Sequence, residues 1–300
     1  MDPERRTRLP TLLEVLEQRA AAPVDLNAFY QFTLKHGEED ALDFWLDVCA
    51  HERLCAIYLY LDNGSAPVPL TGAWRGNLSK RRTAYVHMDP HEHSDATETK
   101  VTLFDLAANA QRVYEQYLVP HSEHELMLPA TVHSTMQFPS ETHALTGDVN
   151  ELLHMFQVPK NYVFAHLEQS LYPTFLQRHA FSNIVPLSAW ARLSCGLLLL
   201  WVAFSTGFSF VFLNTERTTR IWILLPMALA TYFVASYWYN IDPALALAQK
   251  TELGESQLGD VDEPSVRALH AQHAITAVVV AALVCAALTV LFVFVPGHRL

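Results

Sequence analysis

The chain has 300 residues, of which 51% are hydrophobic and 17% charged, and its net charge is −11. Charged residues gather at one end, because residues 1–192 hold 15 of the 20 Lys and Arg and 24 of the 31 Asp and Glu. This division excludes a single soluble domain. The acidic balance argues against binding to duplex nucleic acid, because phosphate contacts need a face rich in Lys and Arg. We therefore expect no nucleic-acid partner.

The amino terminus and the cysteines indicate where the first part of the chain folds. The first 18 residues carry charges and lack the apolar core of a signal peptide. Cys49, Cys55, Cys195 and Cys285 form neither a disulfide framework nor a CxxC metal knuckle, which is consistent with a reducing compartment. We expect residues 1–190 to be a cytosolic domain.

The apolar pattern from Thr11 to Pro186 has the three- and four-residue spacing of helices almost throughout. Asp25 can cap one of these helices. Thr102 and Asp105 form the capping-box pattern ahead of another, whose apolar stripe is Leu103, Leu106, Ala110, Val113 and Tyr117. No alternating strand pattern competes with the helical one. The sequence therefore predicts an all-α, antiparallel helical bundle for this domain.

The helical pattern breaks between Asp62 and Lys100, where we expect an inserted loop over about residues 62–100. Its basic triplet, residues 80–82, is marginal for binding anionic lipid, and a solvated loop is favoured. His87, His91 and His93 are of a type that binds zinc, but no fourth ligand is recognisable. We therefore expect neither a metal nor another cofactor.

Three stretches without a charged residue follow, at 193–213, 221–241 and 274–295. At about 1.5 Å per residue each is about 32 Å long, enough to cross a hydrocarbon core of about 30 Å. We therefore expect residues 191–300 to form a membrane domain of three transmembrane helices, and the chain to be a multi-pass membrane protein in contact with the lipid bilayer.

The simplest topology has the first domain and residues 242–273 in the cytosol. Lys and Arg flank the spans almost equally on the two sides, so the positive-inside rule adds little. Asn63 and Asn77 each begin a glycosylation sequon, which stays unmodified in the cytosol. A glycosylated chain would contradict this orientation.

The predicted spans contain no Asp, Glu, Lys, Arg or His, the residue types that mark ion and substrate pathways. A transporter or channel is therefore disfavoured. The third span has small residues at every fourth position, namely Ala277, Ala281, Cys285 and Thr289. Such a ladder lets two helices approach closely, either inside this domain or between two chains of a homo-oligomer. Alanine is also common in membrane helices, so the pattern requires neither arrangement.

No catalytic motif stands out. The sequence has no GxSxG elbow, no HExxH pair and no phosphate-cradling glycine loop, and it has only 10 glycines. Catalytic groups can be assembled in space from distant residues, so the absence of these motifs does not exclude an enzyme. We expect a non-enzymatic protein, at most an activator of another enzyme.

Three segments carry a family resemblance, in the same chain order. Residues 29–48 (FYQFTLKHGEEDALDFWLDV) combine a Phe-x-x-Phe pair, an acidic turn and a Phe-Trp pair, residues 112–128 (RVYEQYLVPHSEHELML) form a later helix and loop, and residues 172–176 read YPTFL. These segments resemble the motifs of regulator-of-G-protein-signalling domains, over residues 9–185. The predicted loop and the segment 129–147 account for the extra length relative to that family.

The resemblance implies an activity on the GTP-bound G-protein α subunit. Members of the family hold its switch regions in the transition-state shape through loops at one end of the bundle, without a catalytic residue of their own. The equivalent positions here, which we take as candidate partner-binding residues, are Glu39, Asp40, Ala41, Glu125, Met127, Ser170, Leu171 and Thr174.

Several of these positions depart from the family pattern. Ala41 and Met127 stand where the family has asparagines, Ser170 and Leu171 replace an Asp-Ser pair, and Thr174 replaces an arginine. A methionine cannot make the hydrogen bonds of an asparagine amide, and each partner left unpaired costs about 1 to 3 kcal/mol. We therefore expect weak or absent GTPase activation.

A regulator-type domain followed by three spans is similar to the architecture of fungal membrane proteins of bud-site selection. This resemblance implies a cell-polarity scaffold at the plasma membrane, at the bud neck or cell poles, or on an endomembrane, working with a large membrane glycoprotein. We hypothesise a membrane-tethered scaffold with little or no GTPase-activating activity. The alternative is an active GTPase-activating regulator of heterotrimeric G-protein α subunits. A transporter or channel with a helical regulatory domain comes third, and a metal-dependent enzyme built on the histidines comes last. For the first domain alone, a generic helical bundle with coincidental aromatic spacing is the alternative to the family resemblance.

Overall fold

The computed structural model describes residues 8–63, 102–135, 149–254 and 257–295. Residues 64–100 of the predicted inserted loop lie outside the described residues, with the basic triplet and the three histidines in it. The sequon at Asn77 and residues 136–147 of the segment 129–147 also lie outside them.

The chain falls into two compact units. We call residues 16–19 and 29–173 the bundle unit, and residues 1–15, 20–28 and 174–300 the apolar unit. Residues 174–190 thus pack with the apolar unit rather than with the bundle. The division into folding domains at residue 190 stays a prediction.

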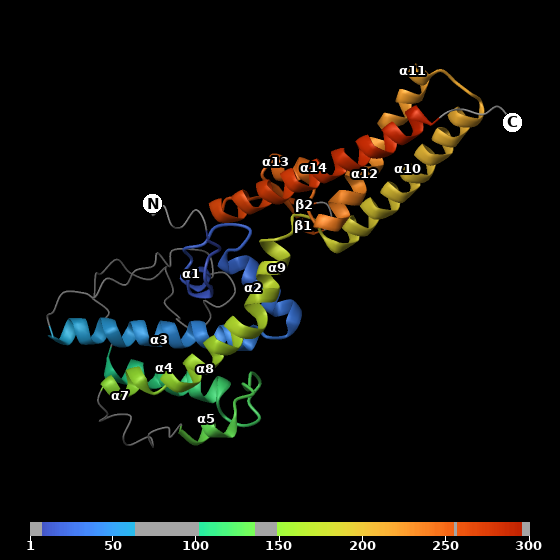
Figure 1. Cartoon of the computed structure of the whole chain (residues 1–300). Coiled ribbons are helices and arrows are strands. Elements are labelled where there is room, and N and C mark those ends of the chain that lie inside the picture. Colours follow the sequence, from blue (N-terminus) through green and yellow to red (C-terminus); the bar gives the residue numbers. More distant parts are fainter. Residues whose placement is uncertain (1–7, 64–101, 136–148, 255–256, 296–300) are drawn as a thin grey trace, which may run out of the picture. The chain divides into compact units, whose positions relative to one another are not determined.

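The bundle unit is helical, as predicted (Figure 1). Its helices are α3 (Glu39–Asn63), α4 (Leu103–Tyr117), α5 (Ala130–Thr135), α7 (Val149–His154), α8 (Gln157–His166) and the π-helix η3 (Leu167–Leu171). Three more helices, α1 (Leu12–Leu16), α2 (Leu26–His36) and α9 (Tyr172–His179), each run from one unit into the other.

Two predicted helix caps are confirmed. The amide of Ala28 donates a hydrogen bond to Oδ1 of Asp25 at 3.2 Å, ahead of α2. At α4, Thr102 and Asp105 form a complete capping box in which each side chain accepts from the other's backbone amide. These bonds satisfy amides that would otherwise lack a partner in the first turn.

Aromatic side chains fill the core of the bundle unit. The ring of Phe44 on α3 makes edge-on contacts with Tyr117 of α4 at 5.6 Å and with Phe156, just before α8, at 6.5 Å between centroids. Phe29 meets Tyr172 in the same way at 6.1 Å. Edge-on packing is favourable for aromatic rings beyond the burial of their area. The aromatic motifs of the sequence are therefore core positions.

The apolar unit contains three helical stretches that are long and apolar enough to cross a membrane, which confirms the three predicted apolar helices. The first is α10 (Pro186–Phe212) and the third is α14 (Pro264–Phe294). The second consists of three consecutive elements, namely α11 (Arg217–Arg220), the 3₁₀ turn η4 (Ile221–Ile223) and α12 (Leu224–Tyr239). Each helical stretch begins before the predicted span. Pro226 lacks an amide hydrogen for a bond to the preceding turn, which is consistent with the 3₁₀ turn before it.

α10 and α14 both pack along α12 (Figure 1). A cluster of buried side chains joins the three helices, and it consists of Ala203, Ile223, Met227, Cys285 and Phe292. Most of the remaining apolar surface of these helices is exposed, as expected for side chains that face lipid.

A short connection between α12 and α14 contains the one sheet found in the described ranges. α13 (Pro243–Leu247) is followed by the antiparallel strands β1 (Lys250–Gly254) and β2 (Gln257–Asp260), with Thr251 opposite Gly259. The sequence did not predict this hairpin. Strands of five and four residues are too short for alternation to be read from one sequence.

Candidate functional site

The turn between α2 and α3 begins the candidate partner-binding region. Gly37 has φ of +68°, a left-handed conformation that glycine adopts without steric cost. Its amide and that of Glu38 donate to the carbonyls of Leu34 and Thr33, at 3.4 and 3.1 Å, and so end α2. α3 then starts with Glu39 and Asp40, whose negative charges suit a helix amino terminus.

Two histidine–carboxylate pairs connect the turn and the start of α3 to the loop after α4 and to the end of α8. Nδ1 of His124, in the loop after α4, lies 2.7 Å from Oδ1 of Asp40. Nε2 of His166, at the end of α8, lies 3.4 Å from Oε2 of Glu38. The start of α3, the loop after α4 and the end of α8 therefore meet at one end of the bundle unit. Sequence analysis missed both histidines, whose partners are distant in the chain.

The loop after α4 presents Met127 at its tip. The amide of Leu126 donates to the carbonyl of Tyr117 at 3.0 Å, and Leu126 itself is buried. The amide of Leu128 donates to the carbonyl of Leu126 at 2.8 Å, which closes a three-residue turn around Met127. As a result 99% of Met127 is exposed. Glu125 is also exposed, and its carboxylate accepts from the amide of His121 at 2.8 Å.

The other candidate positions differ in exposure. Ala41 and Leu171 are both only 7% exposed, so they are core residues rather than contact residues. Leu171 ends the π-helix η3, and the preceding Ser170 is exposed. Thr174 is exposed on α9, in the part of that helix that belongs to the apolar unit.

Some polar groups of this end are already engaged within the protein. Asp40 is bound to His124, and Oε2 of Glu39 is buried without a hydrogen-bond partner in the described structure. The most prominent side chain is apolar, because Met127 offers only a thioether, which is a weak acceptor. Such a surface suits a contact through an apolar tip surrounded by acidic groups better than one through amide hydrogen bonds.

A buried polar link, also missed in the sequence, connects α3, α4 and α7. Nε2 of His51 lies 3.2 Å from the carbonyl oxygen of Leu152, and Nδ1 lies 3.1 Å from Nδ2 of Asn109. Because the carbonyl only accepts and the amide nitrogen only donates, the proton of the neutral ring belongs on Nε2. Burial lowers the pKa of His51, although the bond to Leu152 acts in the opposite direction.

The thiol beside this link is unreactive. Sγ of Cys55 lies 3.5 Å from Nε2 of His51, and burial raises the pKa of Cys55 to about 11. A thiol in that state is not a nucleophile at neutral pH. Within the described residues, no three His, Cys, Asp or Glu side chains are grouped so that they could hold a metal ion.

A second polar network lies in the apolar unit, around Arg192 of α10. Nη2 of Arg192 is 2.8 Å from Oδ2 of Asp242 and 2.9 Å from Oε1 of Glu252. The three side chains are only 14%, 11% and 15% exposed. Oε2 of Glu252 accepts from the amide of Val185 at 3.0 Å, and Ser188 also bonds to Glu252. The network therefore attaches the hairpin strand β1 to the start of α10.

Asp242 connects the same network to α12 and α13. Its Oδ1 accepts from the hydroxyl of Tyr232 and from the amide of Ala244, the second of which caps α13. Its backbone amide donates to Oδ1 of Asn183 at 2.7 Å. Burial acts to raise the pKa of Asp242, but the hydrogen bonds from Tyr232 and Arg192 outweigh it and hold that pKa below its usual value.

The predicted small-residue ladder of the third span lies on α14. Ala277 and Cys285 are buried, and Cys285 belongs to the cluster shared with α10 and α12. Ala281 and Thr289 are partly buried. Close packing of α14 through all four residues stays a prediction, as does pairing between two chains.

Two known families match this chain, one over most of the residues before α10 and the other over the segment that contains the Arg192 network. The sequence model of the Regulator of G protein signaling domain matches residues 16–184, more than half of the chain. The chain belongs to this family. The resemblance drawn from the aromatic motifs is thereby confirmed. A second family, described as the C-terminal domain of Bud site selection protein RAX1, matches residues 181–253, which include Asn183, Arg192, Asp242 and Glu252.

Two curated proteins are similar to the chain. Protein rax1 of Schizosaccharomyces pombe is 29% identical over 231 residues, which cover 74% of this chain and 64% of that protein. Bud site selection protein RAX1 of Saccharomyces cerevisiae is 23% identical over 332 residues, which cover 79% of this chain and 76% of that protein. The match to the first thus leaves about a third of it uncovered. No solved structure matches the chain significantly.

Proposed function

We propose that the chain is a membrane-tethered scaffold of cell polarity and bud-site selection, which binds a partner through its bundle unit and has little or no GTPase-activating activity. The printed name of the Saccharomyces cerevisiae relative supports the biological role. The match of residues 181–253 to the family described as the C-terminal domain of Bud site selection protein RAX1 agrees with it. Three apolar helices provide the membrane attachment.

The observation that carries the proposal is the exposure of Met127 at a position where the family uses an asparagine. A G-protein switch residue that meets this tip finds no amide to pair with, so its own polar group loses water without compensation. Ala41 and Leu171 are buried and provide no substitute contact. The bundle is retained, while the hydrogen-bonding groups that hold the switches are not.

The apolar tip fits a protein contact of another kind. Met127 is flanked by the exposed carboxylate of Glu125, and the side chain of methionine adapts to irregular apolar surfaces. We propose a membrane glycoprotein of the polarity landmark as the partner, with the bundle unit on the cytosolic side of the plasma membrane at the bud neck or cell poles. A homo-oligomer is compatible with this arrangement.

Single-turnover GTP hydrolysis tests the proposal. A G-protein α subunit from the same source is loaded with GTP, and hydrolysis is followed with and without the full chain in lipid nanodiscs. The proposal predicts no acceleration by the wild-type chain. A large acceleration would favour the second candidate function, a GTPase-activating regulator, which membership of the family supports.

Two variants identify the cause. Met127→Asn restores the amide at an exposed position, where folding tolerates it, and Met127→Leu is the matched apolar control. If Met127→Asn accelerates hydrolysis and Met127→Leu does not, the methionine is what removed the activity. If neither accelerates, other positions such as Ala41 and Leu171 also contribute to the loss.

A further inference from the structure

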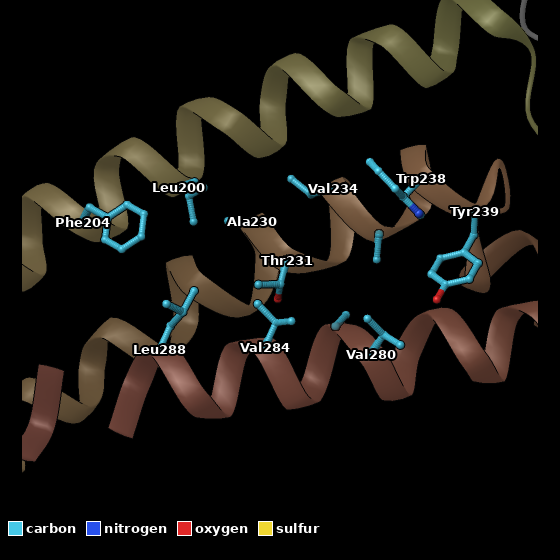
Figure 2. A pocket seen from close by; sticks show the side chains of 12 residues that line it. Leu200, Phe204, Ala230, Thr231, Val234, Trp238, Tyr239, Val280, Val284 and Leu288 are labelled. Carbon is cyan, nitrogen blue, oxygen red and sulfur yellow. The ribbon is translucent and has the colours of Figure 1, made fainter. Parts of the chain in front are cut away.

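The three apolar helices line a pocket of about 410 Å³ along α12. Figure 2 shows Leu200 and Phe204 of α10 on one side, Val284 and Leu288 of α14 on the other, and α12 between them. The pocket is partly open at its side. An apolar pocket at this depth of a membrane faces hydrocarbon rather than water, so a lipid or another protein segment will occupy it.

The size and the surface of the pocket favour a rigid, flat molecule. Ala230 and Ala235 of α12 and Ala281 of α14 contribute only methyl groups to its wall. An apolar cavity of about 150 Å³ holds one benzene ring, so about 410 Å³ accommodates between two and three rings of a fused system, and the rest of a larger ligand would extend through the open part of the pocket. The volume also lies in the range of about 300 to 1,000 Å³ that is typical of small-molecule sites.

One end of the pocket carries the polar atoms that a ligand needs for orientation. Tyr239, the last residue of α12, lies at that end, and its hydroxyl is directed toward α14 (Figure 2). No hydrogen bond to this hydroxyl is found in the part of the chain that the structure describes. The only other hydroxyl in the wall, that of Thr231, already donates to the carbonyl of Met227 at 3.0 Å.

The position of Tyr239 in the span matches the level of lipid headgroups. Tyr239 is partly buried and Trp238 beside it is 78% exposed, and aromatic residues of these two types at the end of a span are typical of the membrane interface. A ligand with a single hydroxyl at one end of a long apolar body would place that hydroxyl at Tyr239 and its body along α12.

Charge argues against a phospholipid in the same place. Residues 240–273, which follow Tyr239, contain six Asp and Glu against two Lys and Arg. Two of these carboxylates, those of Asp242 and Glu252, form a network with the guanidinium of Arg192. The guanidinium is engaged by both carboxylates, so the network has a net negative charge and repels a phosphate. A neutral lipid avoids this cost.

We propose that this pocket is a sterol site, with the fused rings against Ala281 and Val284 and the sterol hydroxyl bonded to Tyr239. The inference concerns the membrane part only and does not depend on what the bundle unit binds. It gives the spans a role beyond anchoring, because sterol content would then affect how α10, α12 and α14 pack.

The test uses the full chain in nanodiscs that contain a sterol analogue with a photoreactive diazirine on its ring system. Ala281→Phe fills the pocket, and Ala282→Phe is the matched control, because Ala282 is exposed and does not line the pocket. We expect labelling of α12 or α14 in the wild type and in Ala282→Phe, and a loss of more than about tenfold in Ala281→Phe. Tyr239→Phe, which keeps the ring, should reduce labelling about fivefold.

Competition identifies the occupant. Excess unlabelled sterol should abolish labelling, and phosphatidylcholine should not. Labelling that survives in Ala281→Phe overturns the proposal. Labelling that phosphatidylcholine removes as well as unlabelled sterol does also overturns it, and points to an acyl chain as the occupant. Labelling replaced by cross-links between two copies of the chain also overturns it. If Ala281→Phe fails to elute as a single species, Tyr239→Phe decides, and unchanged labelling of that variant contradicts the proposal.

Discussion

His124 Nδ1 lies 2.7 Å from Oδ1 of Asp40, so the loop that carries Met127 is attached to the first turn of α3. The two side chains are 84 residues apart in the chain. Because of this pair, the carboxylate of Asp40 is bonded within the protein and is less available to a partner. It also fixes the tip of the loop, so that Met127 projects from a held position rather than from a free segment.

The buried state of His51 predicts a loss of stability in acid. Burial lowers its pKa in the folded chain, whereas the unfolded chain has an ordinary histidine pKa of about 6.5. The unfolded state therefore binds more protons below about pH 6.5, and the stabilisation present above that pH is lost as the pH falls toward the folded-state pKa. Thermal unfolding of the full chain in detergent, followed by tryptophan fluorescence between pH 7.5 and 5, measures the effect.

Variants separate this effect from general acid denaturation. His51→Ala should cost about 1 to 3 kcal/mol at pH 7.5, because Asn109 and the Leu152 carbonyl lose their partner. It should also reduce the dependence on pH, although the buried His270 keeps part of it. His154→Ala, an exposed histidine on α7, is the control and should behave as the wild type. Equal pH dependence in all three proteins would show that His51 is not responsible.

Arg192 should be the most sensitive residue of the apolar unit. Arg192→Gln leaves the carboxylates of Asp242 and Glu252 largely buried without a cation, and breaking such a pair costs about 3 to 5 kcal/mol. The exposed Arg178 of α9 provides the control substitution, Arg178→Gln. The midpoint of thermal aggregation in detergent should fall markedly for the first variant only. Equal midpoints for both would mean that the network contributes little.

Gly196 allows α10 to approach α12. A Cβ at this position would lie 2.9 Å from Cγ2 of Val234 and 3.1 Å from the Val234 backbone nitrogen, which cannot move aside. Gly196→Ala should therefore destabilise the helix pair by about 1 to 3 kcal/mol, more than the gain of up to about 1 kcal/mol in helix propensity. Ser205→Ala on an exposed face of α10 is the control. A more stable Gly196→Ala protein would disprove the close contact.

The orientation in the membrane predicts an unglycosylated chain. Asn63 and Asn77 begin sequons that remain bare if the bundle unit faces the cytosol. Glycosidase treatment of the chain from its own membranes should leave its mobility in gels unchanged. A shift that disappears in the Asn63→Gln, Asn77→Gln double variant would reverse the orientation and exclude contact with a cytosolic G protein.

Much of the fold could be predicted from the sequence, because its signals are local. The capping residues Asp25 and Thr102 lie within three residues of the amides they bind. Each apolar stretch is long enough to be identified as a span from its own residues, without information on the helices that pack against it. The starts of α10 and α14 were missed because their first two turns contain charged residues, Arg192 in α10 and Arg267 in α14, which a search for uncharged runs excludes.

The candidate site could be predicted only in part. The family resemblance located Met127, but its complete exposure depends on the three-residue turn that the Leu128 amide closes. Ala41 and Leu171 were expected on the binding face and are buried, because helix phase at the start of α3 and in the π-helix directs them to the core. Arg192 and Asp242 are 50 residues apart, and no periodicity links such positions.

A cross-linking measurement at position 127 tests the central claim most directly. A photoreactive benzoylphenylalanine replaces Met127 in the full chain, which is irradiated in its own membranes, and the cross-linked products are identified by mass spectrometry and glycosidase sensitivity. The account predicts a membrane glycoprotein in the product, in an amount independent of the nucleotide state of G proteins. A product that contains a G-protein α subunit, and that increases when the α subunit is held in its transition-state form, would contradict it.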